Sequence, residues 1–243
     1  MLNSLNRYYL RQRFFPDAGS ILINPFYFIR KRLVDKIASL APQLHGKLLD
    51  FGCGAKPYQE LFSNVESYIG VDIEDEGQHD HKNEQIDFYY DGKTLPFDNE
   101  TFDSILTSEV LEHVPDVDSI LKELTRVLKP NGKILVTVPF AWQEHELPYD
   151  FRRFTTTGLK KCLTDKNFDI LIEEKTGHYI EVVIQLWMTY LRSLIYVKNK
   201  YINLILNVIF IFPVCITGLL YSCIFPKKRE LYFNSVILAQ KTK

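Results

Sequence analysis

The segment from Leu48 to Gly54 reads Leu-Leu-Asp-Phe-Gly-Cys-Gly, an apolar strand that ends in an acid and leads into a Gly-x-Gly turn. Glycines at positions 52 and 54 let the backbone turn tightly and leave no Cβ between the chain and a ligand, while Asp50 places a carboxylate near the carboxyl end of the strand. Asp72 ends a second short apolar run, at roughly the spacing at which a βαβ unit offers an acid to a ribose. The pattern predicts a nucleotide-cofactor site.

Strand and helix patterns alternate along the chain, which favours an α/β fold with a sheet covered by helices on both faces. Between Asp116 and Lys129 apolar residues recur at helical spacing, and Asp116 is placed to cap the start of that helix. Another helix is expected at about Pro25 to Leu40. We expect seven strands: Lys47 to Phe51, Ser67 to Asp72, Ile86 to Tyr90, Phe102 to Thr107, Gly132 to Val138, Phe168 to Glu174 and Tyr232 to Ala239.

The residue at position 57, three after Gly54, narrows the choice of cofactor. A dinucleotide fingerprint would have a third glycine at position 57, where this chain has Pro57 preceded by Lys56. A bound dinucleotide also needs a helix N-terminus facing its pyrophosphate, and a proline here indicates a wider turn. A cofactor without phosphates would not need that helix end.

Six short motifs follow one another in order: Leu49 to Gly54, Gly70 to Asp72, Leu95 to Phe97, Phe102 to Ile105, Glu109 to Val114 and Arg126 to Gly132. In these motifs the chain strongly resembles the class I S-adenosylmethionine-dependent methyltransferases, in the small-molecule, type 11-like branch. The resemblance implies a Rossmann-like sheet of seven strands, parallel except for an antiparallel last strand, and S-adenosylmethionine as the cofactor. A single Gly-x-Gly is weak evidence, but an ordered series is hard to produce by chance.

The resemblance also implies which residues hold the cofactor. Asp50 would lie near its methionine end, Asp72 would accept hydrogen bonds from the ribose hydroxyls, and Asp91 would face the adenine edge. Other residues of these motifs, at the ends of strands, are also expected to contact the cofactor. The predicted cofactor-binding residues are Asp50, Gly52, Cys53, Gly54, Asp72, Ile73, Asp91, Gly92, Ser108 and Glu109.

The segment from Val138 to Thr155 follows the fifth predicted strand and mixes a histidine, acids, arginines and aromatic residues. A carboxyl-end loop of such a sheet is where an acceptor substrate binds. His145 is the candidate general base because the ordinary pKa of histidine is near neutrality. Glu109 is the second candidate catalytic residue, beside the methyl donor. In the alternative interpretation, His145 and Asp150 only fix the loop through hydrogen bonds.

Glu109, Glu112 and His113 would share one face if their stretch were helical, where they could hold a divalent metal together with His145. Some relatives use a similar Glu-x-x-Glu-His sequence for a metal, but many more carry it without one, and Pro115 would cut the turn short. We therefore assign no metal site.

Composition excludes several classes of function. The formal net charge is −1, so no global field favours nucleic acid as a partner. The four cysteines form no Cys-x-x-Cys pair, which argues against a zinc site and a disulfide framework. The N-terminus has no long apolar core of a secretory signal. A cytoplasmic location is expected, with the inner face of the cytoplasmic membrane as one option.

From Tyr201 to Phe225 the chain has no charged residue, and basic residues flank this run on both sides. The run is long enough to span a bilayer, but spanning would put the last strand on the far side from its sheet. A helical hairpin that dips into one leaflet, broken at Pro213 and Gly218, satisfies both demands. The alternative is that these helices cover the sheet or form a homodimer interface.

These features predict four regions: an N-terminal helical region (1–45), a cofactor-binding core (46–179), an apolar helical insertion that contacts the membrane (180–230) and the last strand (231–243). The expected activity is methyl transfer to a small-molecule acceptor, a saccharide or a lipid-linked saccharide of the cell envelope. One alternative is methylation of a membrane quinone precursor. Another is a scaffold that keeps the fold without turnover.

Overall fold

The structure is a computed structural model that describes residues 8, 10–74 and 85–242. The first seven residues of the predicted N-terminal region, and Lys243 at the end of the last predicted strand, lie outside the described residues. The chain divides into two compact units. The unit formed by residues 1–36 and 176–233 is called the hairpin unit below, and the unit formed by residues 37–175 and 234–243 is called the sheet unit.

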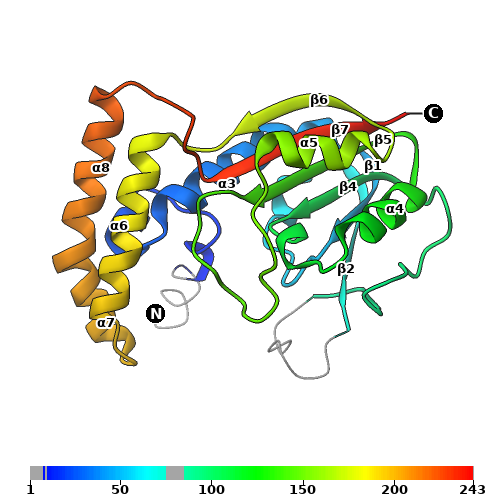
Figure 1. The fold of residues 1–243 in the computed structure, drawn as a ribbon. Coiled ribbons are helices and arrows are strands. Elements are labelled where there is room, and N and C mark those ends of the chain that lie inside the picture. The colour runs from blue at the N-terminus through cyan, green and yellow to red at the C-terminus, as the bar shows by residue number, and fades with distance from the viewer. Residues whose placement is uncertain (1–7, 9, 75–84, 243) are drawn as a thin grey trace. The chain divides into compact units, whose positions relative to one another are not determined.

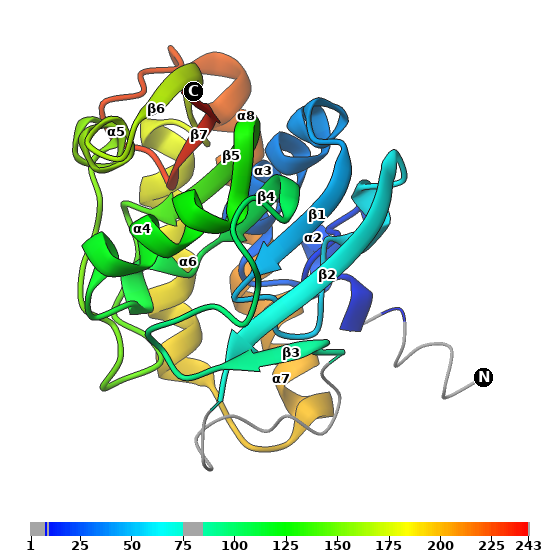
Figure 2. The ribbon, with the colours of Figure 1, turned by 90° about the vertical axis from the view of Figure 1, so that its right-hand side faces the viewer.

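The sheet unit contains a seven-stranded sheet with the order β3-β2-β1-β4-β5-β7-β6 (Figure 2). Strand β7 pairs antiparallel with both β5 and β6, while the other pairings are parallel. The predicted Rossmann-like fold with one antiparallel last strand is therefore confirmed. The strands are β1 (Gly46–Phe51), β2 (Val65–Ile73), β3 (Phe88–Tyr90), β4 (Phe102–Ser108), β5 (Leu128–Pro139), β6 (Phe168–Lys175) and β7 (Asn234–Lys241).

Helices α4 (Val117–Val127) and α5 (Thr156–Thr164) pack on one face of this sheet (Figure 1). Their apolar stripes, including Leu121 and Leu159, join the strand residues in one core cluster. Asp116 caps α4 as the sequence predicted, since its Oδ1 accepts a hydrogen bond from the Ser119 backbone N–H at 3.1 Å. Strand residues that point to the opposite face, such as Leu106, are also fully buried. Burial on both faces is what a largely parallel sheet requires.

The connection from β1 to β2 contains no α-helix. Beyond the glycine turn the chain forms only a short 3-10 turn, η2 (Gln59–Leu61). Pro57 contributes to this, because proline has no backbone N–H and restricts the residue before it. Lys56, just before the proline, has a positive φ of 49°, which is outside the right-handed helical region. The wider turn that the sequence indicated is present, and no helix N-terminus follows the glycines.

Several strand ends differ from the prediction. Strand β3 is limited to Phe88–Tyr90 because it is an edge strand that pairs only with β2. Strand β5 begins earlier, at Leu128, which pairs with Phe102 ahead of a register shift. Strand β7 begins at Asn234 because its ladders with β5 and β6 reach from there to Lys241. These differences are set by pairing partners that are distant in sequence.

The hairpin unit is helical. Its helices are α2 (Ser20–Ile23), the first part of α3 (Tyr27–Leu40), α6 (Tyr179–Ile195), α7 (Lys200–Leu206) and α8 (Phe212–Ile224), and a 3-10 turn η1 (Ala41–Gln43) follows α3 in the sheet unit. A π-helical turn, Asn207–Ile211, joins α7 to α8. Within the described residues, Lys200–Ile224 is the one helix whose length and composition would allow it to cross a membrane.

The predicted breaks at Pro213 and Gly218 are wrong, since the helix runs through both positions. The π turn ends just before Pro213 and shifts the hydrogen-bond pattern there, so the proline stands at the start of a new α-helical segment, where a missing N–H costs little. Gly218 is buried against neighbouring helices. A Cβ there would lie 2.6 Å from Cγ2 of Ile184 and 2.8 Å from Cζ of Phe28.

Replacing Gly218 by Ala should therefore destabilise the hairpin unit. The added methyl group has no space between α6 and α3, and overpacking of this kind costs about 1–3 kcal/mol. Thermal or chemical unfolding followed by circular dichroism measures the change. Thr217→Ala, one residue earlier on the same helix, is the control and should change stability less. Equal stability of the Gly218→Ala protein and the wild type would contradict the close packing.

Candidate active site

The glycine turn lies where β1 ends, between the ends of β2 and β4. Gly52 has φ +71° and Gly54 has φ +45°, a region that favours glycine. The two positions differ in what surrounds them. A Cβ at Gly52 would lie 2.4 Å from a methyl carbon of Val110, whereas nothing lies within 4 Å of a Cβ at Gly54. Gly52 therefore permits close packing, and Gly54 leaves open space in which a ligand can approach the backbone.

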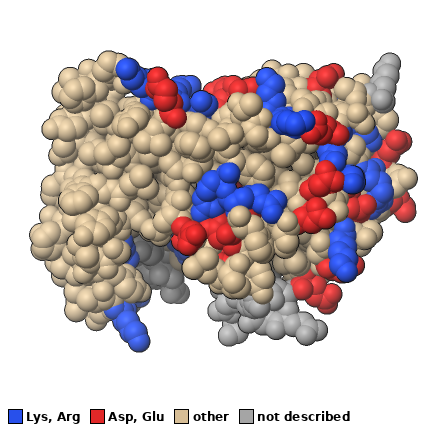
Figure 3. Space-filling model, in the orientation of Figure 1, with Lys and Arg blue, Asp and Glu red and all other residues tan. Residues whose placement is uncertain are grey.

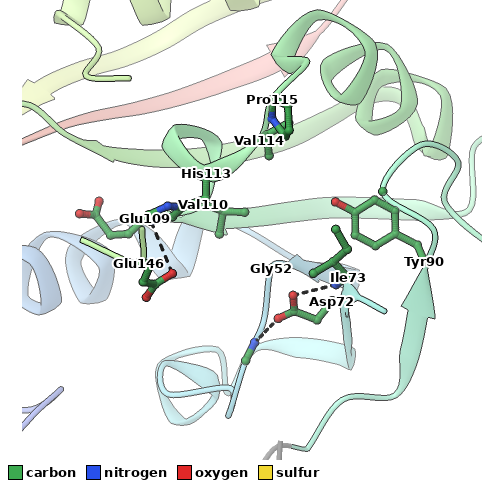
Figure 4. A pocket seen from close by; sticks show the side chains of 12 residues that line it. Gly52, Asp72, Ile73, Tyr90, Glu109, Val110, His113, Val114, Pro115 and Glu146 are labelled. Carbon is green, nitrogen blue, oxygen red and sulfur yellow. Dashed lines mark hydrogen bonds and ion pairs between the residues drawn. The ribbon is translucent and has the colours of Figure 1, made fainter. Parts of the chain in front are cut away.

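Asp72 at the end of β2 holds this turn in place. Its Oδ2 accepts a hydrogen bond from the Gly54 backbone N–H at 2.7 Å, and its Oδ1 accepts one from the Ile73 N–H at 2.8 Å (Figure 4). The carboxylate is half-buried at the edge of a cavity. It can therefore organise the loop and still offer lone pairs to a ligand hydroxyl.

The cavity has a volume of about 280 Å³. Figure 4 shows Asp72, Ile73 and Tyr90 at one end and Glu109, His113 and Glu146 at the other. One end therefore offers an acid, an aromatic ring and an aliphatic side chain, as a nucleoside requires, and the other end is acidic with a histidine. The lining residues are Gly52, Gly54, Asp72, Ile73, Tyr90, Gly92, Glu109, Val110, His113, Val114, Pro115 and Glu146.

Glu109 follows β4 directly and has a positive φ of 58°. Its carboxylate accepts hydrogen bonds from the Thr137 hydroxyl at 2.9 Å and from the Asn234 amide at 2.7 Å. Both partners lie on neighbouring strands, β5 and β7. The carboxylate is thus held in one orientation at the cavity wall by the sheet itself.

His113 lies at the acidic end of the cavity. Its Nδ1 is 3.0 Å from the carbonyl oxygen of Tyr149, and because a carbonyl only accepts, Nδ1 carries the proton. The other nitrogen, Nε2, is 3.7 Å from one oxygen of Glu112 and 3.7 Å from one oxygen of Glu146. In a neutral ring, Nε2 is therefore the atom that can accept a proton.

Glu112 is fully buried, and within the described part of the chain neither of its carboxylate oxygens has a hydrogen-bond partner. Burial raises its pKa well above the ordinary value, and the nearby charge of Glu109 acts in the same direction. A buried carboxylate without a partner is costly unless it is protonated or paired with a cation. Glu112 therefore carries a proton or faces a positive charge.

A helix would place Glu109, Glu112 and His113 on one face, but the stretch is a single 3-10 turn, Leu111–His113. Pro115 contributes to ending it. The fold nevertheless brings Glu112, His113 and His145 together, with one ligand atom of each within 4.8 Å of the others. One carboxylate and two imidazoles suit a divalent cation such as zinc. The expectation of no metal stays a prediction.

The loop after β5 is held by an ion pair. The Asp150 carboxylate is 1% exposed and receives two hydrogen bonds from Arg153, which also donates to the carbonyl of Gln143. The Arg153 guanidinium keeps the pKa of Asp150 far below its usual value. Arg152 donates to the carbonyl of Pro115 at 2.7 Å. Both arginines of the loop are thus engaged in fixing its shape.

His145 belongs to this arrangement rather than to the cavity wall. Its backbone N–H donates to Asp150 at 2.9 Å, its Nδ1 is 3.2 Å from the same carboxylate, and its ring meets the His113 ring edge to face at 4.7 Å between centroids. Burial lowers the pKa of His145, and the neighbouring His113 lowers it further. The geometry matches the alternative in which His145 and Asp150 fix the loop, and a role for His145 as base stays a prediction.

Asp50 lies within β1, below the glycine turn. Its carboxylate accepts a hydrogen bond from the Tyr68 hydroxyl at 2.6 Å. Burial raises the pKa of Asp50 to about 7, the Tyr68 hydrogen bond opposes this rise, and the charge of Asp72 adds to it. A cation bound nearby would favour the ionised carboxylate.

The structure brings together some of the predicted site residues and leaves others outside the cavity. Those that line it are Gly52, Gly54, Asp72, Ile73, Gly92 and Glu109, and those that do not are Asp50, Cys53, Asp91, Ser108 and His145. Asp91 is exposed, and its Oδ1 accepts the backbone N–H groups of Lys93 and Thr94 in a turn. A contact between Asp91 and adenine stays a prediction that this geometry does not support.

Six lining residues were not among the predicted site residues: Tyr90, Val110, His113, Val114, Pro115 and Glu146. The sequence signal at His113 is the Glu-x-x-Glu-His motif, which points to a metal ligand and not to a base. Glu146 had no signal in the sequence. Its place depends on the fold of the loop after β5.

Part of the chain is similar to known proteins. A family model described as "Methyltransferase domain" matches residues 49–136. The chain is 35% identical over 126 residues to the mitochondrial ubiquinone biosynthesis O-methyltransferase of Bos taurus, covering 45% of this chain and 34% of that protein. It is 36% identical over 97 residues to the ubiquinone biosynthesis O-methyltransferase of Pelagibacter ubique, covering 37% of this chain and 40% of that protein. The chain thus spans well under two thirds of the length of these relatives.

The fold is similar to that of phosphoethanolamine N-methyltransferase 2 of Haemonchus contortus, solved in complex with S-adenosyl-L-methionine. The TM-score is 0.55 at 16% identity, and the match covers 92% of this chain and 55% of that one. At this identity the likeness concerns the fold alone.

Replacing Asp72 by Ala should weaken binding of S-adenosylhomocysteine by about 1.5–3 kcal/mol, because hydrogen bonds to a charged group are lost and the glycine turn loses its anchor. Isothermal titration calorimetry measures the affinity. Asp91→Ala is the matched control, an exposed aspartate at the end of the next strand, and should leave the affinity unchanged if Asp91 only caps its turn. Unchanged affinity in the Asp72→Ala protein would remove Asp72 from the cofactor site.

Affinity for S-adenosylhomocysteine should also depend on pH through Asp50. The pKa of about 7 means that this carboxyl becomes neutral as the pH falls through 7, while the cationic amino group of the ligand favours the ionised form. Binding should therefore weaken on acidification, by up to about tenfold per pH unit below 7. Asp50→Asn should abolish this dependence, and an unchanged pH profile in that variant would show that another group titrates.

Proposed function

Because the chain is a class I S-adenosylmethionine-dependent methyltransferase, we propose that it methylates a hydroxyl oxygen of an aromatic acceptor, a phenolic precursor of a membrane quinone. The sequence alone favours a saccharide or a lipid-linked saccharide as the acceptor, with a quinone precursor as the alternative. The relatives named as ubiquinone biosynthesis O-methyltransferases support this alternative instead. The acceptor of those proteins is transferred to this chain as a proposal only.

The observation that carries the proposal is the orientation of His113. With the proton on Nδ1 engaged by the Tyr149 carbonyl, Nε2 is directed to the acidic end of the cavity and is free to accept a proton. Methyl transfer to a phenol oxygen requires removal of the phenol proton, and a positioned histidine is suited to this step. An acceptor without a proton to lose would not need that arrangement.

The loop after β5 supports an apolar aromatic acceptor. The arginines that suggested a charged or saccharide acceptor are both engaged, Arg152 with the Pro115 carbonyl and Arg153 with Asp150. The same loop exposes Leu147, Tyr149 and Phe151 to solvent. Exposed aromatic and aliphatic side chains beside a cavity fit a ring that carries a hydrocarbon chain.

When bound, S-adenosylmethionine supplies an electrophilic methyl group on a sulfonium. Asp72 would hold its ribose, and Asp50 would stabilise the positive charge at its methionine end. Glu109, held by Thr137 and Asn234, would face the transferred methyl group and fix the direction of approach. His113 would take the phenol proton at Nε2, and the adjacent carboxylates of Glu112 and Glu146 would stabilise the imidazolium that forms.

An acceptor of this kind resides in the membrane, so the enzyme is proposed to work at the inner face of the cytoplasmic membrane. Contact with the membrane would deliver the acceptor without passage through water.

A methyl-transfer assay with short-chain prenylated phenols and catechols, read out as S-adenosylhomocysteine formation and product mass, tests the proposal. His113→Gln should lower kcat by about 100-fold or more, the usual contribution of a general base, and should leave S-adenosylhomocysteine affinity within about twofold. His145→Gln, which changes the other ring of the same pair, is the matched control and should lower kcat less. Assays in a chelator separate the base from a metal role.

Methylation of saccharides but not of phenols would refute the acceptor class. Full turnover in the His113→Gln protein would refute the base. Loss of activity in the chelator, restored by a divalent cation, would reassign His113 and Glu112 as metal ligands.

A further inference from the structure

The hairpin unit has an outer face that is almost wholly apolar. In Figure 3 the surface over α7 and α8 is uncharged except at its two ends. Large hydrophobic side chains are exposed along the full length of the hairpin, several by more than half, as in Ile209 at 55% and Leu220 at 58%. The residues of this outer face are Val183, Leu186, Trp187, Tyr190, Leu194, Ile202, Ile205, Ile209, Phe210, Leu220, Tyr221 and Ile224.

The inner face of the same helices includes several buried polar side chains. Gln185 of α6 is fully buried, donates to the Pro25 carbonyl at 2.7 Å and accepts from the Phe28 N–H at 3.1 Å. Asn207 is buried and accepts from Arg192 at 3.1 Å, and the buried Glu181 pairs with Arg32. A helix in water puts its polar residues outside. This arrangement is inverted, as in helices whose outer faces meet lipid.

The charge of the hairpin has one sign. Between Val182 and Arg229 the sequence contains six basic residues and no acidic residue. Lys198 and Lys200 lie at the tip of the hairpin, and Lys227, Lys228 and Arg229 follow its last helix. A rim of positive charge around an apolar face is complementary to anionic headgroups above acyl chains.

We propose that the outer face of the hairpin unit inserts into one leaflet of a bilayer that contains anionic lipids. Trp187 and Tyr190, whose rings pack at 5.4 Å, lie half-exposed on α6 and are suited to the level of the headgroups. This inference depends on the hairpin unit alone. It can be tested independently of the acceptor chemistry proposed above.

The hairpin lies in the membrane surface and does not span it. Gln185, near the middle of α6, packs on the start of α3, and α3 carries Arg30, Lys31 and Asp35 within its next turns. In a spanning hairpin these charges would be in the hydrocarbon core, which is strongly unfavourable. With the hairpin in the surface plane, α3 faces water and the outer face meets lipid.

A second copy of the chain is a poorer occupant of this face. A symmetric dimer through it would bring the basic rim of one copy close to the same rim of the other, with no acidic residue on the hairpin between positions 182 and 229 to compensate. Anionic lipid has the opposite charge.

Flotation of the full-length protein with phosphatidylcholine vesicles, with and without phosphatidylglycerol, tests the proposal. Wild-type protein should float with the anionic vesicles, and the Ile209→Glu/Leu220→Glu protein should bind at least about tenfold more weakly. Leu171→Glu, which changes an exposed leucine of β6 in the sheet unit, is the matched control and should bind like wild type. Each Lys→Gln change at positions 198 and 200 should cost about fivefold on anionic vesicles.

Both changed residues of the double variant are exposed, so it should fold. Circular dichroism and unchanged affinity for S-adenosylhomocysteine verify this. Wild-type protein that remains unbound to both vesicles, or a double variant that floats like wild type, would overturn the proposal. If the wild-type protein forms a dimer without lipid and the double variant is a monomer, the outer face contacts a second copy of the chain and the proposal is overturned.

Cysteine labelling with a membrane-impermeant maleimide separates the two ways of entering the bilayer. In a protein whose exposed Cys223 is replaced by Ser, Lys198→Cys reports on the tip and Glu230→Cys on the base of the hairpin. On intact vesicles both positions should stay reactive from outside. Protection of the tip alone would mean that the hairpin spans the bilayer and would overturn the one-leaflet arrangement.

Discussion

The hydrogen bond from the Gly54 backbone N–H to the Asp72 carboxylate is the contact on which the site depends. It joins the turn after β1 to the end of β2, and the parallel pairing of these strands brings both groups to the same edge of the sheet. Because β4 pairs with the other side of β1, Glu109 reaches the same edge. One sheet register thus sets the distance between Asp72 at one end of the cavity and Glu109 at the other.

The acidic end of the cavity, where we propose that the acceptor binds, is built differently, because it depends on a loop outside the sheet. The Asp150–Arg153 ion pair holds this loop in shape. Arg152 donates a hydrogen bond to the Pro115 carbonyl and His113 donates one to the Tyr149 carbonyl, and these two bonds attach the loop to the segment that follows β4. Glu112 belongs to the 3-10 turn of this segment, and within the described residues its buried carboxylate has no hydrogen-bond partner. Buried carboxyl groups with a strongly shifted pKa are frequent in active sites, where they exchange a proton or pair with a cation. For this reason we assign the proposed proton transfer to the acidic end of the cavity.

The two units differ in which side chains they bury and which they expose. In the sheet unit the strands and α4 hide apolar residues and expose charges. In the hairpin unit polar side chains such as Gln185 are buried, and aliphatic ones such as Leu220 are exposed. The mean hydropathy of the chain, −0.10, averages over the two units and therefore reveals neither distribution of apolar residues. Which solvent a helix meets follows from the direction of its polar face, and that direction is known only once its packing partners are known.

The sequence by itself determined the sheet, the glycine turn, the Asp116 cap and the place of Asp72, because each follows from a local pattern: alternation, a positive φ that favours glycine, or a side chain at a strand end. It did not determine strand ends, the continuity of the helix through Pro213, or which histidine faces the cavity. His113 and His145 carry equivalent rings, and only the Tyr149 carbonyl and the Asp150 carboxylate, both brought by a long-range loop fold, distinguish them. Contacts between residues far apart in sequence decided these points, since no local pattern encodes them.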